Sequence, residues 1–146
     1  MRRRQVAAAA AAGPRLRVWT AAIPHLFVVC GADRKPVWHA RFHRQLVIDS
    51  DREAAELAAL QGLWLAGKAR EDYGAGGARV SLVLAYSHTV DLDALDLMAI
   101  ECGLLLDLTV DRQTNPALAY CRGSRIRTGW RTADLTTLID HQQDTP

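Results

Sequence analysis

Carboxylates are the side chains of this chain best suited to chemistry, and most of them lie in its middle part. Residues 45–111 contain twelve acidic and four basic residues, whereas residues 1–44 contain nine basic residues and one acid. Converging carboxylates hold Mg²⁺ or Mn²⁺, and a pair of such ions activates water for phosphodiester hydrolysis. One combination would form a metal site: Glu53 and Glu56, one turn apart on an expected helix, with Asp111 at the end of a later strand.

These acids also have a purely structural explanation, which we favour. Negative side chains are common at the starts of helices, where they face the positive end of the helix dipole. Glu53 would then cap its helix, and Asp111 would occupy a turn. The same explanation covers three acids at the start of a later helix, Asp91, Asp93 and Asp96.

Arginines near the C-terminus form a second candidate site. In residues 112–146, five arginines come before any acid. Arginines bind phosphates, and an aromatic ring among them can stack on a base, so nucleic acid is a candidate partner. The predicted nucleic-acid-binding residues are Arg122, Arg125, Arg127, Trp130 and Arg131. A solvated polar segment explains these residues equally well, and both interpretations stay open.

The histidines and cysteines form no recognisable motif. His39 and His43 share a strand face but lie roughly 13 Å apart along it, too far for one metal ion. The cysteines are widely spaced in apolar surroundings, which predicts core thiols in a reducing compartment. They are Cys30, Cys102 and Cys121.

The composition is that of one globular domain. Of the 146 residues, 49% are hydrophobic and 23% are charged, which excludes the composition of a disordered chain. No apolar run approaches the ~18 residues of a membrane span, so we expect no membrane partner and a cytoplasmic location. The sequence leaves the oligomeric state undefined.

Hydrophobic periodicity predicts the elements that would position these residues. Strands are expected at residues 15–23, 25–30, 37–47, 79–86 and 104–110. Helices are expected at residues 50–69, 91–102 and 115–122, with a further terminal helix at 132–142. Residues 1–14 are expected to form a disordered tail, and residues 124–146 an arginine-containing extension.

Two of these elements have distinct polar and apolar faces. In residues 37–47 the even positions are mostly apolar and the odd positions, which include His39 and Arg41, are polar, as in a strand with one solvated face. In the helix at 50–69, Ser50 and Glu53 have the spacing of a capping box. The apolar face of this helix is expected to contain Leu57, Leu60 and Trp64.

The predicted order of three strands, helix, strand, helix, strand and helix indicates an α/β fold, a mixed five-stranded sheet with helices packed on it. Over residues 15–123 this order resembles the ribonuclease H type 1 fold. Residues 18–22 (VWTAA) resemble the family's first strand, and residues 55–60 (AELAAL) the E-L-x-A-A start of its first helix. Residues 82–87 (LVLAYS) resemble the fourth strand, and residues 111–119 (DRQTNPALA) the final strand-to-helix corner.

The resemblance implies cleavage of the RNA strand of an RNA–DNA hybrid by two divalent cations that four acids hold. Three of the four positions are not acidic in this chain. The first-strand acid is replaced by Ala21, the fourth-strand acid by Tyr86 and the last-helix acid by Leu118. Only the helix position, Glu56, keeps a carboxylate, and one carboxylate cannot hold two ions about 4 Å apart.

The sequence therefore predicts a ribonuclease H-like domain that has lost hydrolysis and either binds nucleic acid, as an RNA–DNA hybrid or a duplex, or acts as a scaffold. No cofactor is expected in that case. Two alternatives stay open. One is an active hybrid ribonuclease with Mg²⁺ or Mn²⁺ held by Glu53, Glu56 and Asp111. The other is a protein–protein interaction module without a nucleic-acid partner.

Overall fold

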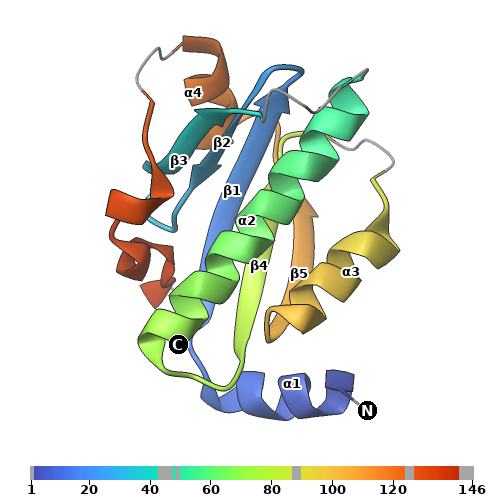
Figure 1. The fold of residues 1–146 in the computed structure, drawn as a ribbon, viewed down its shortest axis with the longest axis vertical. Helices are drawn as coiled ribbons and strands as arrows, with labels where there is room; N and C mark the ends of the chain where they lie inside the picture. Colours follow the sequence, from blue (N-terminus) through green and yellow to red (C-terminus); the bar gives the residue numbers. More distant parts are fainter. Residues whose placement is uncertain (1, 43–47, 49, 87–89, 124–126, 142–146) are drawn as a thin grey trace.

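Five strands form one mixed sheet in the computed structural model, which describes residues 2–42, 48, 50–86, 90–123 and 127–141. The spatial order is β3-β2-β1-β4-β5 (Figure 1). The strands are β1 (Arg15–Ile23), β2 (Leu26–Cys30), β3 (Pro36–Arg41), β4 (Ala78–Leu84) and β5 (Leu104–Val110). β1 pairs antiparallel with β2, and β2 with β3, whereas β1, β4 and β5 run parallel. The predicted α/β fold with a mixed five-stranded sheet is confirmed.

Helices cover both faces of this sheet. α2 (Asp51–Tyr73) and α3 (Leu92–Glu101) lie in front of it in Figure 1, and α4 (Pro116–Gly123) lies behind it. Neighbouring strand residues point to opposite faces, so Val18 packs in the core beneath α2 and Trp19 in a second core beneath α4. This second cluster, here called the α4 core, consists of Trp19, Ala21, Leu26, Val28, Cys30, Val83, Ala85, Ala117, Leu118 and Cys121.

The buried face of α2 consists mostly of small residues, with two leucines among them. A Cβ atom on Gly62 would lie 2.7 Å from the Cγ2 atom of Thr20 on β1, so the α2 backbone packs directly against the Thr20 side chain. The three large residues predicted to form the apolar face, Leu57, Leu60 and Trp64, are only partly buried. The fully buried face consists of Ala54, Ala58, Ala59, Gly62, Leu63, Leu65, Ala66, Gly67 and Ala69.

The capping signal predicted at the start of α2 is confirmed, and the helix continues to Tyr73, beyond its expected end at residue 69. The side chain of Ser50 accepts a hydrogen bond of 3.1 Å from the backbone N–H of Glu53, which confirms Ser50 as the N-cap. Gly74 ends the helix in the left-handed conformation (φ 85°), and its N–H donates to the carbonyl of Arg70. Glycine suits this position because it lacks the Cβ atom that disfavours positive φ.

The predicted disordered tail at residues 1–14 is wrong. Residues Arg2–Ala12 form a helix, α1, that lies across the lower end of the sheet in Figure 1. Val6 and Ala10 are buried, and a Cβ atom on Gly77 would lie 2.8 Å from the Cβ of Ala9. Alanine has the highest helix propensity, and its small side chain lets α1 pack directly on the glycine-containing loop before β4.

The solvated face predicted for the third strand is also wrong. His39 is 1% exposed. The N–H of His39 donates to the carbonyl of Thr128 at 2.8 Å, and the reverse bond measures 3.1 Å. The chain after α4 therefore covers the free edge of β3. β3 ends at Arg41, and predicted strand residues 43–47, which include His43, lie outside the described residues.

The helix predicted at residues 132–142 is replaced by two short 3₁₀ turns, Trp130–Thr132 and Leu135–Leu138. Asp134 caps the second turn by accepting from the N–H of Thr136, and the chain then extends to form a β-bridge between Ile139 and Leu16. Leu138 is fully buried, and Asp140 pairs with Arg17 at 3.0 Å. The described part of the C-terminal extension thus packs on the domain and contributes Leu138 to its core.

Within the described residues, we find no helix with the length and apolar character needed to span a bilayer.

Candidate functional site

The carboxylate of Glu56 binds the start of α3. Its Oε1 atom accepts a hydrogen bond of 2.7 Å from the backbone N–H of Asp91. Asp91 is the N-cap residue of α3, and its own carboxylate accepts from the N–H of Ala94 at 3.0 Å. Both acids therefore satisfy backbone donors at a helix N-terminus, where negative charge is favoured.

Glu56 opens onto a hollow of about 310 Å³. It is lined by three acidic residues, one arginine and one serine, namely Glu53, Glu56, Asp91, Arg52 and Ser50. In the part of the chain that the structure describes, no three side chains of His, Cys, Asp or Glu are arranged to hold a metal ion. The hollow gathers acids, but the carboxylates of Asp91 and Glu56 are directed at helix caps.

Asp111, the third residue of the alternative metal site, does not line this hollow. It follows β5, and one carboxylate oxygen accepts from the N–H of Thr114 at 2.8 Å. The other oxygen accepts from the Thr114 hydroxyl. These bonds, the hydroxyl's above all, hold the pKa of Asp111 below its usual value. Asp111 thus closes the turn that leads into α4.

The three replaced acid positions belong to the α4 core or pack against it. Ala21 and Leu118 are both buried members of the α4 core, and Tyr86 packs against it. Burial in the same cluster raises the pKa of the Cys30 and Cys121 thiols to about 12. Such surroundings disfavour charge, so this side of the sheet is built for packing where the family resemblance places metal ligands.

Two arginines meet at Tyr86. The guanidinium of Arg112 lies over the Tyr86 ring, 5.4 Å from its centre. Arg122, in the last turn of α4, donates a hydrogen bond of 2.6 Å from Nη2 to the Tyr86 hydroxyl. Both arginines are exposed, and Tyr86 is half-buried. We call these three residues the Tyr86 site.

Arg122 is one of the predicted binding residues, whereas Arg112 and Tyr86 were not predicted as its neighbours. Tyr86 follows β4 and Arg112 follows β5, and these two strands are parallel neighbours. The carboxyl ends of parallel strands meet at one edge of a sheet, where ligands commonly bind. The order of the elements therefore contained the signal for this pairing.

The remaining predicted nucleic-acid-binding residues lie elsewhere. Arg127 precedes the bridge to β3, with its Nη1 atom 3.4 Å from Nε2 of His39. Trp130 packs edge-on against Trp64, with ring centres 4.8 Å apart, and Arg131 lies over the Trp130 ring. Trp130 is thus engaged in an aromatic cluster beside α2. Arg125 lies outside the described residues.

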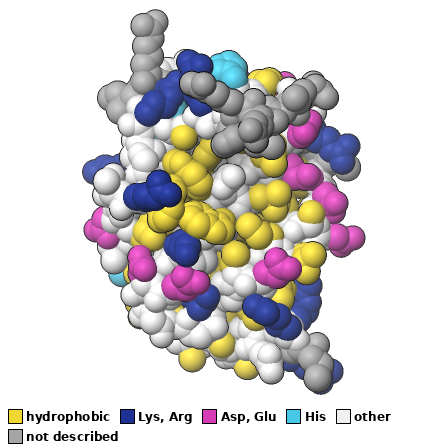
Figure 2. Space-filling view, in the orientation of Figure 1, with side chains coloured by type: hydrophobic (Ala, Val, Ile, Leu, Met, Phe, Trp, Pro, Cys, Tyr) yellow, Lys and Arg dark blue, Asp and Glu magenta, His cyan; other side chains and the backbone are white. Residues whose placement is uncertain are grey.

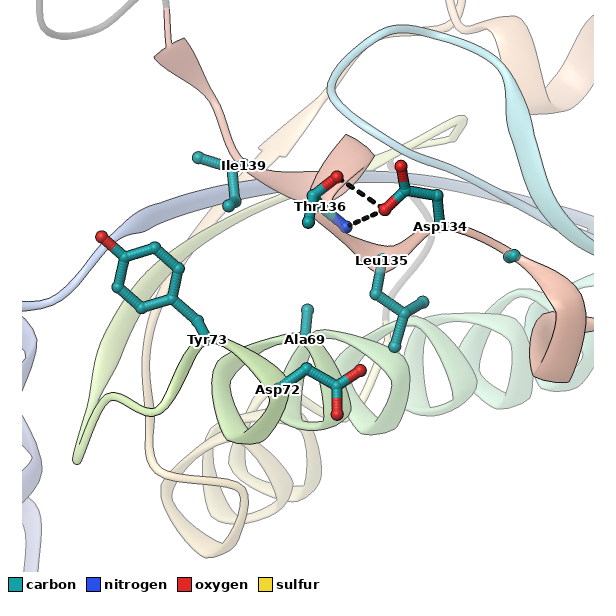
Figure 3. A pocket seen from close by; sticks show the side chains of 8 residues that line it. Ala69, Asp72, Tyr73, Asp134, Leu135, Thr136 and Ile139 are labelled. Atoms are coloured by element: carbon teal, nitrogen blue, oxygen red, sulfur yellow. Dashed lines mark hydrogen bonds between the residues drawn. The ribbon is translucent and has the colours of Figure 1, made fainter.

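A further hollow of about 230 Å³ lies between the end of α2 and the C-terminal segment (Figure 3). The Asp134 carboxylate at its rim accepts from both the N–H and the hydroxyl of Thr136, which lowers the pKa of Asp134. In Figure 3 the carboxylate of Asp72 and the hydroxyl of Tyr73 both point away from the hollow. This hollow gathers no set of reactive groups among the residues that line it.

The chain has no match among known protein families, curated proteins or solved structures in any of the three comparisons. Its geometry is therefore the basis for a functional proposal.

Proposed function

We propose that this chain is a ribonuclease H-like domain without hydrolytic activity, and that it binds the phosphates of nucleic acid at the Tyr86 site. The fold part of the proposal rests on the element order between residues 15 and 123. Three strands, helix, strand, helix, strand and helix follow one another there, and this order is the basis of the resemblance. The sheet that they form has the mixed arrangement that the resemblance implies.

One observation carries the loss of hydrolysis. The positions that the resemblance assigns to three metal-binding acids, Ala21, Tyr86 and Leu118, all belong to or pack against one apolar core. At the fourth position, an oxygen of the Glu56 carboxylate accepts a hydrogen bond from the N–H of Asp91. Two Mg²⁺ ions need several anionic oxygens at one point, and the described residues offer no such set.

The binding part of the proposal rests on the charge and shape of the Tyr86 site. Two exposed arginines contact the half-buried Tyr86, Arg112 over its ring and Arg122 at its hydroxyl. Guanidinium groups bind phosphate oxygens through paired hydrogen bonds, and Tyr86 holds these two groups close together. The arrangement fits a sugar–phosphate backbone that crosses the edge where β4 and β5 end.

Fluorescence anisotropy with labelled RNA–DNA hybrid, duplex DNA and single strands at low salt tests this binding. We expect Arg112→Gln and Arg122→Gln each to weaken binding and to lower the salt slope by about one. Arg79→Gln is the matched control, because Arg79 is exposed at the opposite end of β4. No binding by any of these nucleic acids, or equal losses in all three variants, would contradict the proposal.

A cleavage assay on the hybrid with Mg²⁺ and with Mn²⁺ tests the loss of hydrolysis. We expect no turnover in either metal. Turnover that Glu56→Gln abolishes would overturn the proposal and favour the active enzyme with a site of Glu53, Glu56 and Asp111. In that case calorimetry should detect metal binding that Asp111→Asn removes.

A further inference from the structure

The side of α2 that faces away from the sheet carries a regular set of residues, here called the outward stripe. At 100° per residue its members fall within about 100° of arc, opposite the small residues that contact the sheet. They are Glu53, Leu57, Leu60, Gln61, Trp64 and Lys68.

The outward stripe presents apolar surface. Leu57, Leu60 and Trp64 are only partly buried against the core, and the Trp64 ring also packs on the rings of Trp38 and Trp130. Figure 1 shows no described element in front of α2. Figure 2 shows hydrophobic side chains gathered across the middle of this face, with charged side chains around them. A hollow of about 240 Å³ lies within the patch, lined by Trp38, Leu60, Gln61, Trp64 and Met98.

The order of residues along the outward stripe is self-complementary. Each member has a counterpart at the same distance on the other side of the midpoint between Leu60 and Gln61. Leu57 corresponds to Trp64, and Glu53 to Lys68. One end of the stripe is therefore acidic and the other basic, with large apolar residues between them.

We propose that a second copy of this chain binds the outward stripe, with the two α2 helices antiparallel about a two-fold axis near Leu60 and Gln61. This arrangement places Glu53 opposite Lys68 of the partner subunit, twice in the dimer. It also places Leu57 opposite Trp64 of the partner subunit. A two-fold axis pairs each residue with its counterpart in this way, because both copies use the same surface.

The dimensions of α2 suit this pairing. A helix of 23 residues is about 34 Å long, and Glu53 and Lys68 lie well inside its ends. Helices that cross at about 20° keep their side chains in contact over several turns. An apolar centre with charged pairs at its rim is the usual anatomy of an interface between proteins.

Lys68, the basic end of the outward stripe, already has two contacts within one copy of the chain. The ammonium of Lys68 lies 5.3 Å from the centre of the Trp64 ring and 3.6 Å from a carboxylate oxygen of Glu71. Surface ion pairs of this kind contribute little to stability, so Lys68 can turn to the carboxylate of a second copy at small cost. The aromatic ring then lies beside the pair and limits its access to water.

The dimer does not use the Tyr86 site, so its test is independent of nucleic-acid binding. Sedimentation equilibrium of the full chain should show a concentration-dependent increase from 16.1 kDa towards twice that mass. Glu53→Lys and Lys68→Glu should each weaken the dimer about tenfold or more, since each places like charges opposite one another at two points. A one-to-one mixture of the two variants should restore association, because every facing pair is again opposite in charge.

Asp51→Lys is the matched control, because it adds the same charge to the same helix end but lies off the stripe. We expect it to dimerise like the original chain, and circular dichroism checks that every variant is folded. A monomer at the highest soluble concentration overturns the proposal. So does a dimer that the two single variants leave unchanged, or a mixture of the two that stays monomeric.

Discussion

Glu56 on α2 and Asp91 at the start of α3 are joined by a hydrogen bond of 2.7 Å, from the backbone N–H of Asp91 to the Glu56 carboxylate. The two residues are far apart in sequence, and the bond fixes where α3 begins relative to α2. The same carboxylate is the one acid that the ribonuclease H resemblance retains. Its position is therefore explained by helix capping without any metal ion.

Removal of the Glu56 carboxylate should lower stability. We expect Glu56→Ala to reduce the free energy of unfolding by about 1–2 kcal/mol, because a charged acceptor at a helix N-terminus is lost. Glu56→Gln keeps an acceptor oxygen and should cost less. Urea denaturation measures both, with Arg52→Ala as a control, because Arg52 is exposed in the same hollow. Equal stability of all three variants and the original chain would show that the bond contributes nothing.

The close approach of α2 to β1 predicts an unusual effect of a glycine-to-alanine change. Alanine favours a helix by about 0.8–1 kcal/mol over glycine, yet a Cβ on Gly62 would lie 2.7 Å from Thr20 Cγ2. We therefore expect Gly62→Ala to destabilise the protein by about 1–3 kcal/mol. Gly123→Ala, where a Cβ would meet nothing within 4 Å, should be neutral or stabilising. Thermal unfolding compares the two, and a higher melting temperature for Gly62→Ala would contradict the packing.

The predicted sheet and central helices could be read from the sequence because their signals are local. Hydrophobic periodicity predicts the strands, and the spacing of Ser50 and Glu53 predicts the start of α2, without reference to the rest of the chain. The buried face of α2 could not be predicted in this way. A large residue such as Trp64 favours burial but is only partly buried, whereas at Gly62 the Thr20 side chain leaves no room for even a Cβ atom.

The candidate site was harder to predict because it depends on contacts between distant segments. Tyr86 and Arg112 become neighbours only when β4 and β5 pair. Trp130 looked like a stacking residue among arginines, but its ring packs against Trp64. His39 looked solvated because its strand alternates, and the chain around Thr128 then covers it. In each case the deciding partner lies far away along the chain.

The packing of α1 predicts that its buried valine matters while its exposed residues do not. Val6 is 6% exposed, and Ala8 lies on the solvent side of the same helix. Val6→Asp should release α1 and lower the free energy of unfolding by about 1–3 kcal/mol, the range for burying one such side chain. Ala8→Asp should have little effect. Limited trypsin digestion at the N-terminal arginines should accelerate only in the Val6 variant, and equal rates would contradict the docking of α1.

The thiols of the α4 core predict a loss of stability at alkaline pH. Burial raises the pKa of both Cys30 and Cys121 from 9.0 to about 12. Between these values the unfolded chain has released protons that the folded chain keeps. The free energy of unfolding should therefore be unaffected by these groups below about pH 8 and should fall as the pH rises above 9. The slope is at most about 1.4 kcal/mol per pH unit for each thiol.

Urea denaturation between neutral and alkaline pH checks this dependence against a Cys30→Ala, Cys121→Ala variant. The variant should start less stable, because two buried side chains become smaller, but its stability should decline less steeply above pH 9. Cys102 provides an internal comparison, since it is only half-buried. It should react first with a thiol reagent at neutral pH. Parallel pH profiles for the variant and the original chain would show that the two buried thiols ionise normally, and the apolar character assigned to the α4 core would then be wrong.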